Sequence, residues 1–232
     1  MTNISEFKFD SRDELVTQLK ENVMEALNKG IKVRGNASML LSGGTTPGPL
    51  YQAMSNCDLE WQNAWFAPTD ERWVAPDHND SNEKLIRETL IQNKASAAHY
   101  IGLKSAPNNP RVGQKETEQK IKQLPSRFDV VLLGMGEDGH TASLFPNLEE
   151  TEYALNESCV QHCAPISRGN GEVDRMTMTL NCLLNSKNVI LYFYGNKKLE
   201  VFEQAKKAKS LTLPVSYLLH QKRTPVSLFW AE

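Results

Sequence analysis

The sequence predicts an α/β protein built on one doubly wound, mainly parallel sheet. Short apolar segments recur along the chain, each of the length of a single buried strand. Longer amphipathic segments separate them, and this alternation is typical of a parallel sheet covered by helices on both faces. Polar motifs, two of them rich in glycine, directly follow three of the apolar segments. Ligands bind at such positions in open α/β sheets.

The clearest single element is a helix expected over Ser11–Lys29. Its apolar residues repeat every four positions and form one stripe, which consists of Leu15, Leu19, Val23 and Leu27. Ser11 and Glu14 fit a capping box at the start of this helix. Gly30 is the residue expected to end it.

The remaining elements follow from the same alternation. Strands are expected at Ala37–Leu41, Trp65–Pro68, His99–Ile101, Phe128–Leu133, Asn188–Tyr194 and Pro225–Trp230. Helices are expected near Pro47–Met54, Asn82–Asn93, Arg111–Gln123 and Lys197–Lys207. Tyr153–Met178 has no clear period, and we expect it to include antiparallel strands. The Pro/Asn-rich stretch Ser105–Arg111 is too short to separate two cores, so residues 1–232 are expected to form one Rossmann-like domain.

Charge and hydropathy exclude two classes of partner. The chain has 26 Lys and Arg against 28 Asp and Glu, a formal net charge of -2, and no basic cluster of the kind that binds nucleic acid. Its longest apolar runs, such as Val189–Tyr194, are far too short to span a bilayer. A small anionic ligand would therefore have to be held by a few local cations, because the field of the whole protein does not attract it.

The four cysteines, Cys57, Cys159, Cys163 and Cys182, are expected to be reduced thiols. The first residues contain acids and no apolar core, unlike a signal peptide. We therefore expect a cytoplasmic protein. Cys159, His162 and Cys163 lie close enough in sequence to suggest zinc, but a second pair of ligands is missing. No metal is expected.

The first polar motif is Ser42-Gly43-Gly44-Thr45, followed by Thr46 and Pro47. Glycines let the backbone approach an anion, and successive N–H groups form a concave nest for it. Thr46 is expected to cap the next helix, with Pro47 in its first position, which leaves a positive helix end beside the loop. The motif predicts a phosphate cradle, and the alternative is a plain strand-to-helix turn.

The second motif runs from Asp70, Glu71 and Arg72 to Asn82 and is expected to be a charged loop. Carboxylates accept hydrogen bonds from sugar hydroxyls, and arginine binds phosphate in a bidentate manner. We therefore expect Asp70 and Arg72 to contact a ligand. Ser81 or Asn82 can cap the following helix. The alternative is an internal ion pair with a helix cap.

The third motif is Gly134-Met135-Gly136-Glu137-Asp138-Gly139-His140. It matches the dinucleotide pattern G-x-G-x-x-G in form only, because its strand lies in mid-chain and its acids would repel a pyrophosphate. A histidine at the mouth of a site can act as a general base, with glycines leaving room for a ligand. We assign His140 and Asp138 to the catalytic group. The alternative is a capping Asp138 with a structural His140.

Two further cations, Arg175 and Lys198, lie at or near the ends of predicted elements. Each would be a solvated surface charge if it stood alone. A serine hydrolase would need the pattern G-x-S-x-G, and the sequence has none. Ser42 is therefore expected to help bind an anion and not to act as a nucleophile.

Together these motifs resemble the 6-phosphogluconolactonases, which belong to the superfamily of glucosamine/galactosamine-6-phosphate isomerases. The resemblance covers nearly the whole chain in the expected order, and its most specific piece is Asp138–Pro146. The similar stretches are Ser42–Pro47, Asp70–Asn82, Gly134–Pro146, Arg175–Leu180 with Leu183–Asn185, Gly195–Lys198, Leu213–Ser216 and Phe229-Trp230. The chain departs from the pattern at Asn181, where a proline is usual, and at Ser167–Asp174, which is longer and more polar.

The resemblance implies a fold of the sugar-phosphate isomerase/lactonase type and hydrolysis of 6-phospho-D-glucono-1,5-lactone in the oxidative pentose phosphate pathway, without cofactor or metal. His140 would activate water, and Asp70 would contact the sugar or support the site. The phosphate and nearby oxygens would be held by Ser42, Gly43, Gly44, Thr45, Arg72, Arg175 and Lys198. Backbone N–H groups near Gly136–Gly139 are the candidate oxyanion donors. The only partner expected is this small molecule, and the chain would be a monomer or a homodimer.

Two other functions remain open from the sequence. A glucosamine-6-phosphate deaminase/isomerase would carry an acidic residue before Pro146 for proton transfer, and Phe145 stands there. A non-catalytic sugar-phosphate sensor is possible on the same fold, although the chain has no added DNA-binding segment.

Overall fold

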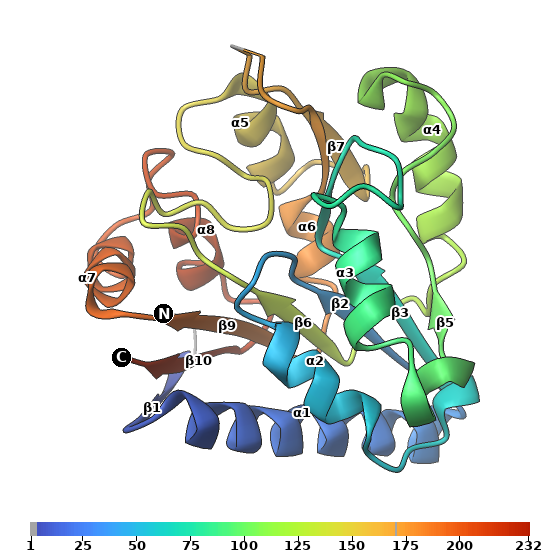
Figure 1. Cartoon of the computed structure of the whole chain (residues 1–232). Coiled ribbons are helices and arrows are strands. Elements are labelled where there is room, and N and C mark those ends of the chain that lie inside the picture. The colour runs from blue at the N-terminus through green and yellow to red at the C-terminus, as the bar shows by residue number, and fades with distance from the viewer. Residues whose placement is uncertain (1–3, 170) are drawn as a thin grey trace.

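The computed structural model describes residues 4–169 and 171–232, and a seven-stranded parallel sheet forms its centre (Figure 1). The order of the strands is β1-β10-β9-β6-β2-β3-β5. Their bounds are β1 Ile4–Phe9, β2 Ala37–Leu41, β3 Ala64–Pro68, β5 His99–Tyr100, β6 Val130–Leu133, β9 Val189–Tyr194 and β10 Val226–Ala231. The predicted doubly wound, mainly parallel α/β sheet is confirmed.

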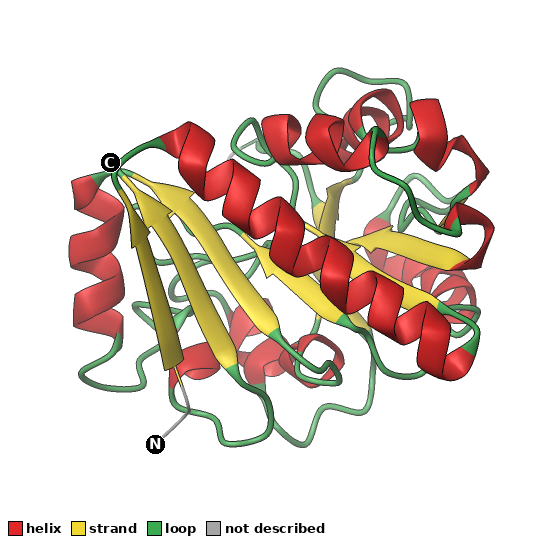
Figure 2. Ribbon diagram, turned by 90° about the horizontal axis from the view of Figure 1, so that it is seen from below, coloured by secondary structure: helices red, strands yellow, loops and turns green. Residues whose placement is uncertain are grey.

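Helices cover both faces of this sheet. One face carries α1 Arg12–Arg34, α2 Gly48–Ser55 and α3 Asn82–Thr89. The other carries α4 Pro110–Ile121, α5 Glu149–Leu155, α6 Leu180–Leu183, α7 Asn196–Ala205 and α8 Ser216–Leu219. Short 3₁₀ turns lie at Trp61–Asn63 and Asn93–Ala97. Figure 2 shows α1 running obliquely across its face of the sheet.

Alternate residues of each central strand belong to different cores. Met39 and Leu41 of β2 pack with α1 and α2, whereas Leu40 between them packs on the opposite side. Val131 of β6 likewise faces the opposite core from Leu132. Both cores exclude water, which explains why these strands are continuous apolar runs in the sequence and not alternating ones.

A small antiparallel sheet stands beside the large one. Its strands are β4 Asp70–Arg72, β8 Arg175–Met178 and β7 Cys163–Ile166, in that order. The expectation of antiparallel strands within Tyr153–Met178 is confirmed. The expectation of a loop at Asp70–Arg72 was wrong, because this segment pairs with β8, which lies far away in the sequence.

The order of the strands creates a switch point between β2 and β6. After β2 the chain builds outward through β3 and β5, and it then returns to add β6, β9 and β10 on the other side of β2. The loops after β2 and β6 therefore diverge at the carboxyl end of the sheet. A crevice at this position is where open α/β sheets bind ligands.

The capping of α1 differs from the prediction at one end. Ser11 caps its start as expected, since its Oγ accepts a hydrogen bond from the N–H of Glu14 at 3.2 Å. The prediction that Gly30 ends the helix was wrong, because α1 continues to Arg34. Gly35, with φ of 80°, is the left-handed residue that ends it.

Two other local predictions were wrong. Thr46 does not cap α2 with its side chain, and Pro47 is the residue before that helix and not the first one in it. β1 was missed because it is an edge strand whose middle residues are exposed, so it lacks the apolar run of a buried strand. Ser81 does cap α3, through a hydrogen bond from the N–H of Lys84.

Among the described residues, no helix combines the length and the apolar character needed to cross a membrane. Cys159, Cys163 and Cys182 are buried free thiols, and Cys57 is a half-buried free thiol. Burial, followed by the nearby charge of Glu118, raises the pKa of the Cys182 thiol to about 12. The thiol of Cys182 is therefore an unreactive core group.

Candidate active site

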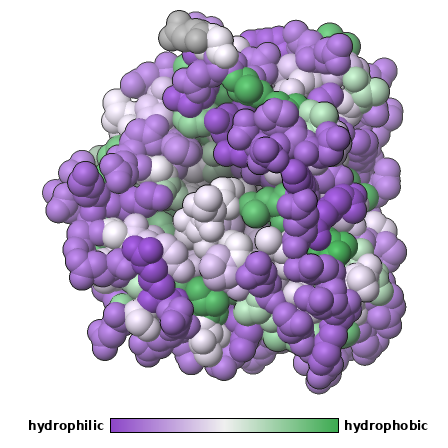
Figure 3. Space-filling model, in the orientation of Figure 1, coloured by the Kyte–Doolittle hydropathy of each residue, from purple (hydrophilic) through white to green (hydrophobic). Residues whose placement is uncertain are grey.

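The carboxyl ends of β2 and β6 open into a cavity of about 260 Å³. Seen from the side of Figure 1, the surface is mostly hydrophilic and is hollowed near its middle (Figure 3). The cavity wall includes the substrate-binding residues predicted from the sequence together with the predicted base, namely Ser42, Gly43, Gly44, Thr45, Asp70, Arg72, Arg175, Lys198 and His140. The structure thus brings together side chains that are far apart in the sequence.

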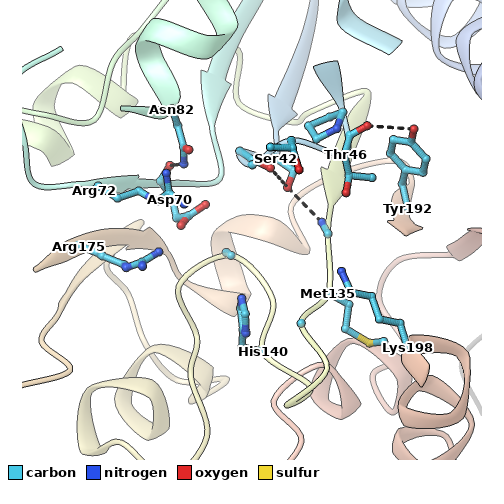
Figure 4. A pocket seen from close by; sticks show the side chains of 17 residues that line it. Ser42, Thr46, Asp70, Arg72, Asn82, Met135, His140, Arg175, Tyr192 and Lys198 are labelled. Atoms are coloured by element: carbon cyan, nitrogen blue, oxygen red, sulfur yellow. Dashed lines mark hydrogen bonds between the residues drawn. The ribbon is translucent and has the colours of Figure 1, made fainter. Parts of the chain in front are cut away.

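The conformation of the loop after β2 favours glycine at two positions, at Gly43 because of close packing and at Gly44 because of its backbone angle. A Cβ atom on Gly43 would lie 2.0 Å from Oδ1 of Asn82, and Gly44 has a φ of +82°. Ser42 Oγ accepts a hydrogen bond from the N–H of Gly134 at 3.2 Å, which ties this loop to the one after β6 (Figure 4). The backbone of Gly43 and Gly44 therefore lines the cavity without side chains in between.

The loop after β6 presents His140 to the cavity, where its ring points into the open space (Figure 4). Asp138 accepts two hydrogen bonds through Oδ1, one from the His140 ring Nδ1 at 2.6 Å and one from the His140 N–H at 3.1 Å. A Cβ atom on Gly136 would lie 2.2 Å from Nδ1 of His140. This glycine thus makes room for the histidine–aspartate pair, and it also lines the cavity, where we expected glycines to leave room for a ligand.

The environment of Asp138 favours its ionised form. Partial burial raises the pKa of this carboxyl, but the charge of His140 and the hydrogen bonds from its backbone and ring outweigh this, and the net pKa lies below its ordinary value. An ionised carboxylate accepts the proton of Nδ1, so Nε2 is left as the acceptor nitrogen of a neutral ring. This arrangement suits a general base.

Two arginines face each other across β4 and β8. Arg72 and Arg175 are directly paired in the register of these strands. Both Nε atoms are buried and have no partner within the part of the chain that the structure describes. Burial lowers the pKa of Arg175, and the charges of Arg72 and Arg168 lower it further against the pull of Asp70. Like charges held opposite one another with unused donors favour an anionic ligand between or beside them.

Lys198 approaches the cavity from another direction, on the first turn of α7 just after Gly195. In Figure 4 it lies on the side of the cavity opposite Arg72 and Arg175, with His140 between them. A ligand with charged or polar ends on both sides of a central reactive group would match this distribution.

Two groups that were considered from the sequence are already used by other contacts. The N–H groups of Gly136 and Gly139 already donate within their own loop, to the carbonyls of His140 and Gly136, so neither is free for an oxyanion. The suggested zinc ligand His162 instead forms a hydrogen bond with Glu118, 2.8 Å from Nδ1 to Oε2. Across residues 4–169 and 171–232, no group of three His, Cys, Asp or Glu residues is placed to hold a metal ion.

Comparison with known proteins identifies the family of this chain. A family model described as "Glucosamine-6-phosphate isomerases/6-phosphogluconolactonase" matches residues 10–230. The chain belongs to this family. It is 30% identical to the 6-phosphogluconolactonase of Rhizobium meliloti (strain 1021), over 96% of this chain and 97% of that one. It is 32% identical to the 6-phosphogluconolactonase of Helicobacter pylori (strain J99), over 97% of each chain.

Solved structures also show similarity to proteins of this family. A 6-phosphogluconolactonase from Shewanella baltica OS155 superposes with a TM-score of 0.93 at 35% identity, covering 100% of this chain and 98% of that chain. A monomeric glucosamine-6-phosphate deaminase superposes with a TM-score of 0.80 at 17% identity, which shows a shared fold only. The resemblance seen in the sequence is confirmed, and with it the prediction that the chain is an enzyme of this family.

Other residues of the cavity wall were not predicted as ligand contacts, and they are Thr46, Pro47, Asn82, Gly134, Met135, Gly136, Ala142 and Tyr192. Asn82 was considered only as a helix cap, but its Nδ2 donates to the carbonyl of Asp70 at 2.7 Å and its Oδ1 is buried without a partner among the described residues. Tyr192 gave no signal, because it stands within an apolar strand. Ala142 has a φ of 48°, which no sequence pattern shows.

Proposed function

We propose that this chain hydrolyses 6-phospho-D-glucono-1,5-lactone to 6-phospho-D-gluconate, using a water molecule activated by His140. The observation that carries the proposal is the contact of Asp138 with His140, which lines a cavity that has cations on two sides. The relatives named above are 6-phosphogluconolactonases that match almost the whole chain. Their names supply the substrate, and the cavity supplies groups with the chemistry that this substrate needs.

The proposed step begins with a water molecule between His140 and the lactone carbonyl. His140 Nε2 takes a proton from this water as its oxygen bonds to C1, and the carbonyl oxygen becomes an oxyanion. The bond from C1 to the ring oxygen then breaks, and the protonated His140 returns the proton to that oxygen. A lactone is an activated ester, so a positioned base and charge stabilisation suffice, and no covalent nucleophile is required.

The polar wall would hold the two ends of the substrate around this centre. The N–H groups of the Ser42–Thr45 loop, with Arg72, Arg175 and Lys198, would bind the phosphate and nearby oxygens. Asp70 would accept a hydrogen bond from a sugar hydroxyl. Its side chain is buried, and a 2.5 Å hydrogen bond from Ser143 Oγ fixes its Oδ2. The N–H groups of Gly136 and Gly139 already donate within their own loop, so they are not assigned to the oxyanion.

The side chain next to the base argues against a deaminase or isomerase. Phe145 is buried, and its ring lies 4.7 Å from the ring of His140, centroid to centroid. Arg175 lies over the same ring at 5.1 Å. An aldose–ketose isomerisation needs a carboxylate that moves protons at this position, and an aromatic ring cannot do so.

The experiment that tests the proposal presents the wild-type protein with two substrates. The lactone is generated in place from glucose 6-phosphate, and its spontaneous opening is measured without protein and subtracted. Glucosamine 6-phosphate is tested in parallel for release of ammonia. We expect acceleration of lactone hydrolysis and no deamination. Deamination would favour the isomerase function, and sugar-phosphate binding with no turnover of either compound would favour the sensor.

A further inference from the structure

Tyr51 in α2 combines complete burial with one polar contact at the proposed site. Its relative exposure is 0%, and it packs in the core with residues of α1 and β2. Its hydroxyl donates a hydrogen bond to the carbonyl of Ser42 at 2.7 Å. Burial raises the pKa of Tyr51 well above its ordinary value, so this hydroxyl remains a donor at any working pH.

A hydrogen bond to the Ser42 carbonyl also fixes the N–H of the next residue. In a planar trans peptide the C=O and the following N–H point in opposite directions, and the described chain has no cis peptide bond. The Ser42 carbonyl points toward Tyr51, which lies in the core. The N–H of Gly43 therefore points away from the core, and Gly43 is part of the cavity wall.

A second tyrosine holds the other end of the same loop. The hydroxyl of Tyr192 in β9 donates to the carbonyl of Thr46 at 3.2 Å (Figure 4). It also shares a hydrogen bond with the hydroxyl of Tyr194, whose ring carries the guanidinium of Arg12 at 4.6 Å from its centroid. The carboxyl-terminal end of the loop is thus connected, through the side chains of Tyr192 and Tyr194, to Arg12 in α1.

The middle of the loop has much less support. Gly44 and Thr45 are exposed, and no heavy atom lies within 4 Å of the position that a Cβ on Gly44 would occupy. The three atoms nearest to the position of a Cβ on Gly43 all belong to the amide of Asn82. The conformation of Ser42–Thr46 therefore depends on its two ends, where the tyrosine hydroxyls bind.

We propose that Tyr51 and Tyr192 are positioning residues that hold the Ser42–Thr46 loop with its N–H groups directed at the phosphate of the substrate. This inference rests on the proposed function, which makes the loop a phosphate cradle. Preorganised N–H donors bind an anion better than donors that must be ordered on binding. Tyr51 lies outside the cavity wall and acts through the Ser42 carbonyl, whereas Tyr192 holds the loop through the Thr46 carbonyl and also lines the cavity.

The test uses inorganic phosphate as the probe, with binding measured by titration calorimetry for wild type, Tyr51→Phe and Tyr192→Phe. Each variant removes one hydroxyl and keeps the ring. We expect each to raise the Kd for phosphate about tenfold, the size expected when one charged hydrogen bond is misdirected. KM for the lactone should rise by a similar factor, while kcat stays within about twofold, because His140 and Asp138 are untouched.

Thr117→Val is the matched control for loss of stability. Thr117 is fully buried in α4, and its hydroxyl donates to the carbonyl of Leu103 at 2.8 Å, away from the loop. It should lower Tm to an extent comparable with the tyrosine variants and leave the Kd for phosphate at the wild-type value. If Tyr51→Phe does not fold, Tyr192→Phe carries the same test.

Unchanged phosphate binding in both tyrosine variants would overturn the inference, and so would a wild-type protein that binds no phosphate. An equal loss of phosphate affinity in Thr117→Val would reduce the tyrosines to general structural residues. Because phosphate binding needs no turnover, failure of wild type to hydrolyse the lactone would contradict the proposed function alone.

Discussion

At the scale of single residues, the candidate site depends on how Asp138 and Gly136 set the ring of His140. Asp138 and His140 are two residues apart in a glycine-rich loop. Only the structure shows that the carboxylate accepts hydrogen bonds from both the ring and the backbone N–H of the histidine. The space for this pair comes from Gly136, whose role we had assigned to ligand access. A sequence shows residue types and spacing, whereas the direction of a side chain depends on the backbone around it.

Asp138→Asn should lower kcat for the lactone and leave KM nearly unchanged. The amide keeps the shape of the carboxylate but removes the charge that stabilises the protonated ring. Since general-base catalysis contributes about 10²- to 10⁴-fold, we expect a loss of at least about tenfold. Steady-state kinetics measure it, with Glu137→Gln, a neighbouring exposed residue, as control. Equal kcat in the two variants would show that the pair has no catalytic role.

The arginine pair gives a second prediction at this scale. Arg175→Met removes a half-buried charge that lies opposite Arg72, so the ligand-free protein should be as stable as wild type or more stable. The rise in Tm caused by phosphate should shrink, because a donor to the anion is lost. Thermal denaturation with and without phosphate measures both effects, and Arg127→Met, an exposed arginine, is the control. A destabilised variant with a full phosphate response would contradict the assignment.

At the scale of elements, the buried strands were predictable and the pieces that depend on distant partners were not. β2, β6 and β9 are apolar on both faces and therefore distinct in the sequence. β1 lies at an edge with exposed residues, and β4 exists because it pairs with β8. The end of α1 was misplaced because a glycine inside a helix looks like a stop signal until its surroundings are known.

Gly30→Ala should destabilise the protein even though alanine favours helix by about 1 kcal/mol over glycine. The new Cβ would lie 2.8 Å from Oδ2 of Asp129, a buried carboxylate bonded to Arg34 and Lys187. We expect a net loss of about 1–3 kcal/mol in the free energy of unfolding, by analogy with overpacked cores. Urea denaturation measures it. An increase in stability would contradict this prediction, because it would mean that the Asp129 carboxylate shifts away from the new methyl group at little cost.

Glu71 links β4 to the start of α3 and should make stability depend on pH. It accepts hydrogen bonds from the N–H groups of Asn82 and Glu83, at 2.7 and 2.8 Å. Burial raises its pKa from 4.5 to about 7, against the pull of these bonds. A raised folded-state pKa means that the contribution of this group to stability is complete below the unfolded pKa and is lost as pH rises through about 7.

Glu71→Gln should therefore remove part of the pH dependence. Between about pH 5 and about pH 8, the free energy of unfolding of wild type should fall by about 1–3 kcal/mol more than that of the variant. Denaturant unfolding at a series of pH values gives these numbers, and Glu25→Gln, on the exposed side of α1, is the control. Parallel pH profiles for wild type and Glu71→Gln would contradict this account of the carboxyl.

At the scale of the whole molecule, the class of fold and the place of the site followed from one argument. Alternating strands and helices predicted a parallel sheet, and polar motifs after the strands predicted a site at its carboxyl edge. The structure adds the order of the strands, which sets β2 beside β6 and so places the glycine loop opposite His140. That order depends on pairings between distant segments. The prediction of one domain over residues 1–232 stays a prediction.

The measurement that most directly tests the central claim is the rate of lactone disappearance with wild type and with His140→Ala, after subtraction of spontaneous hydrolysis. Phosphate binding by the variant serves to show that its cavity is intact. If His140 activates water, the variant should lose at least about a hundredfold in kcat. A variant that binds phosphate and still hydrolyses the lactone at close to the wild-type rate would contradict the account.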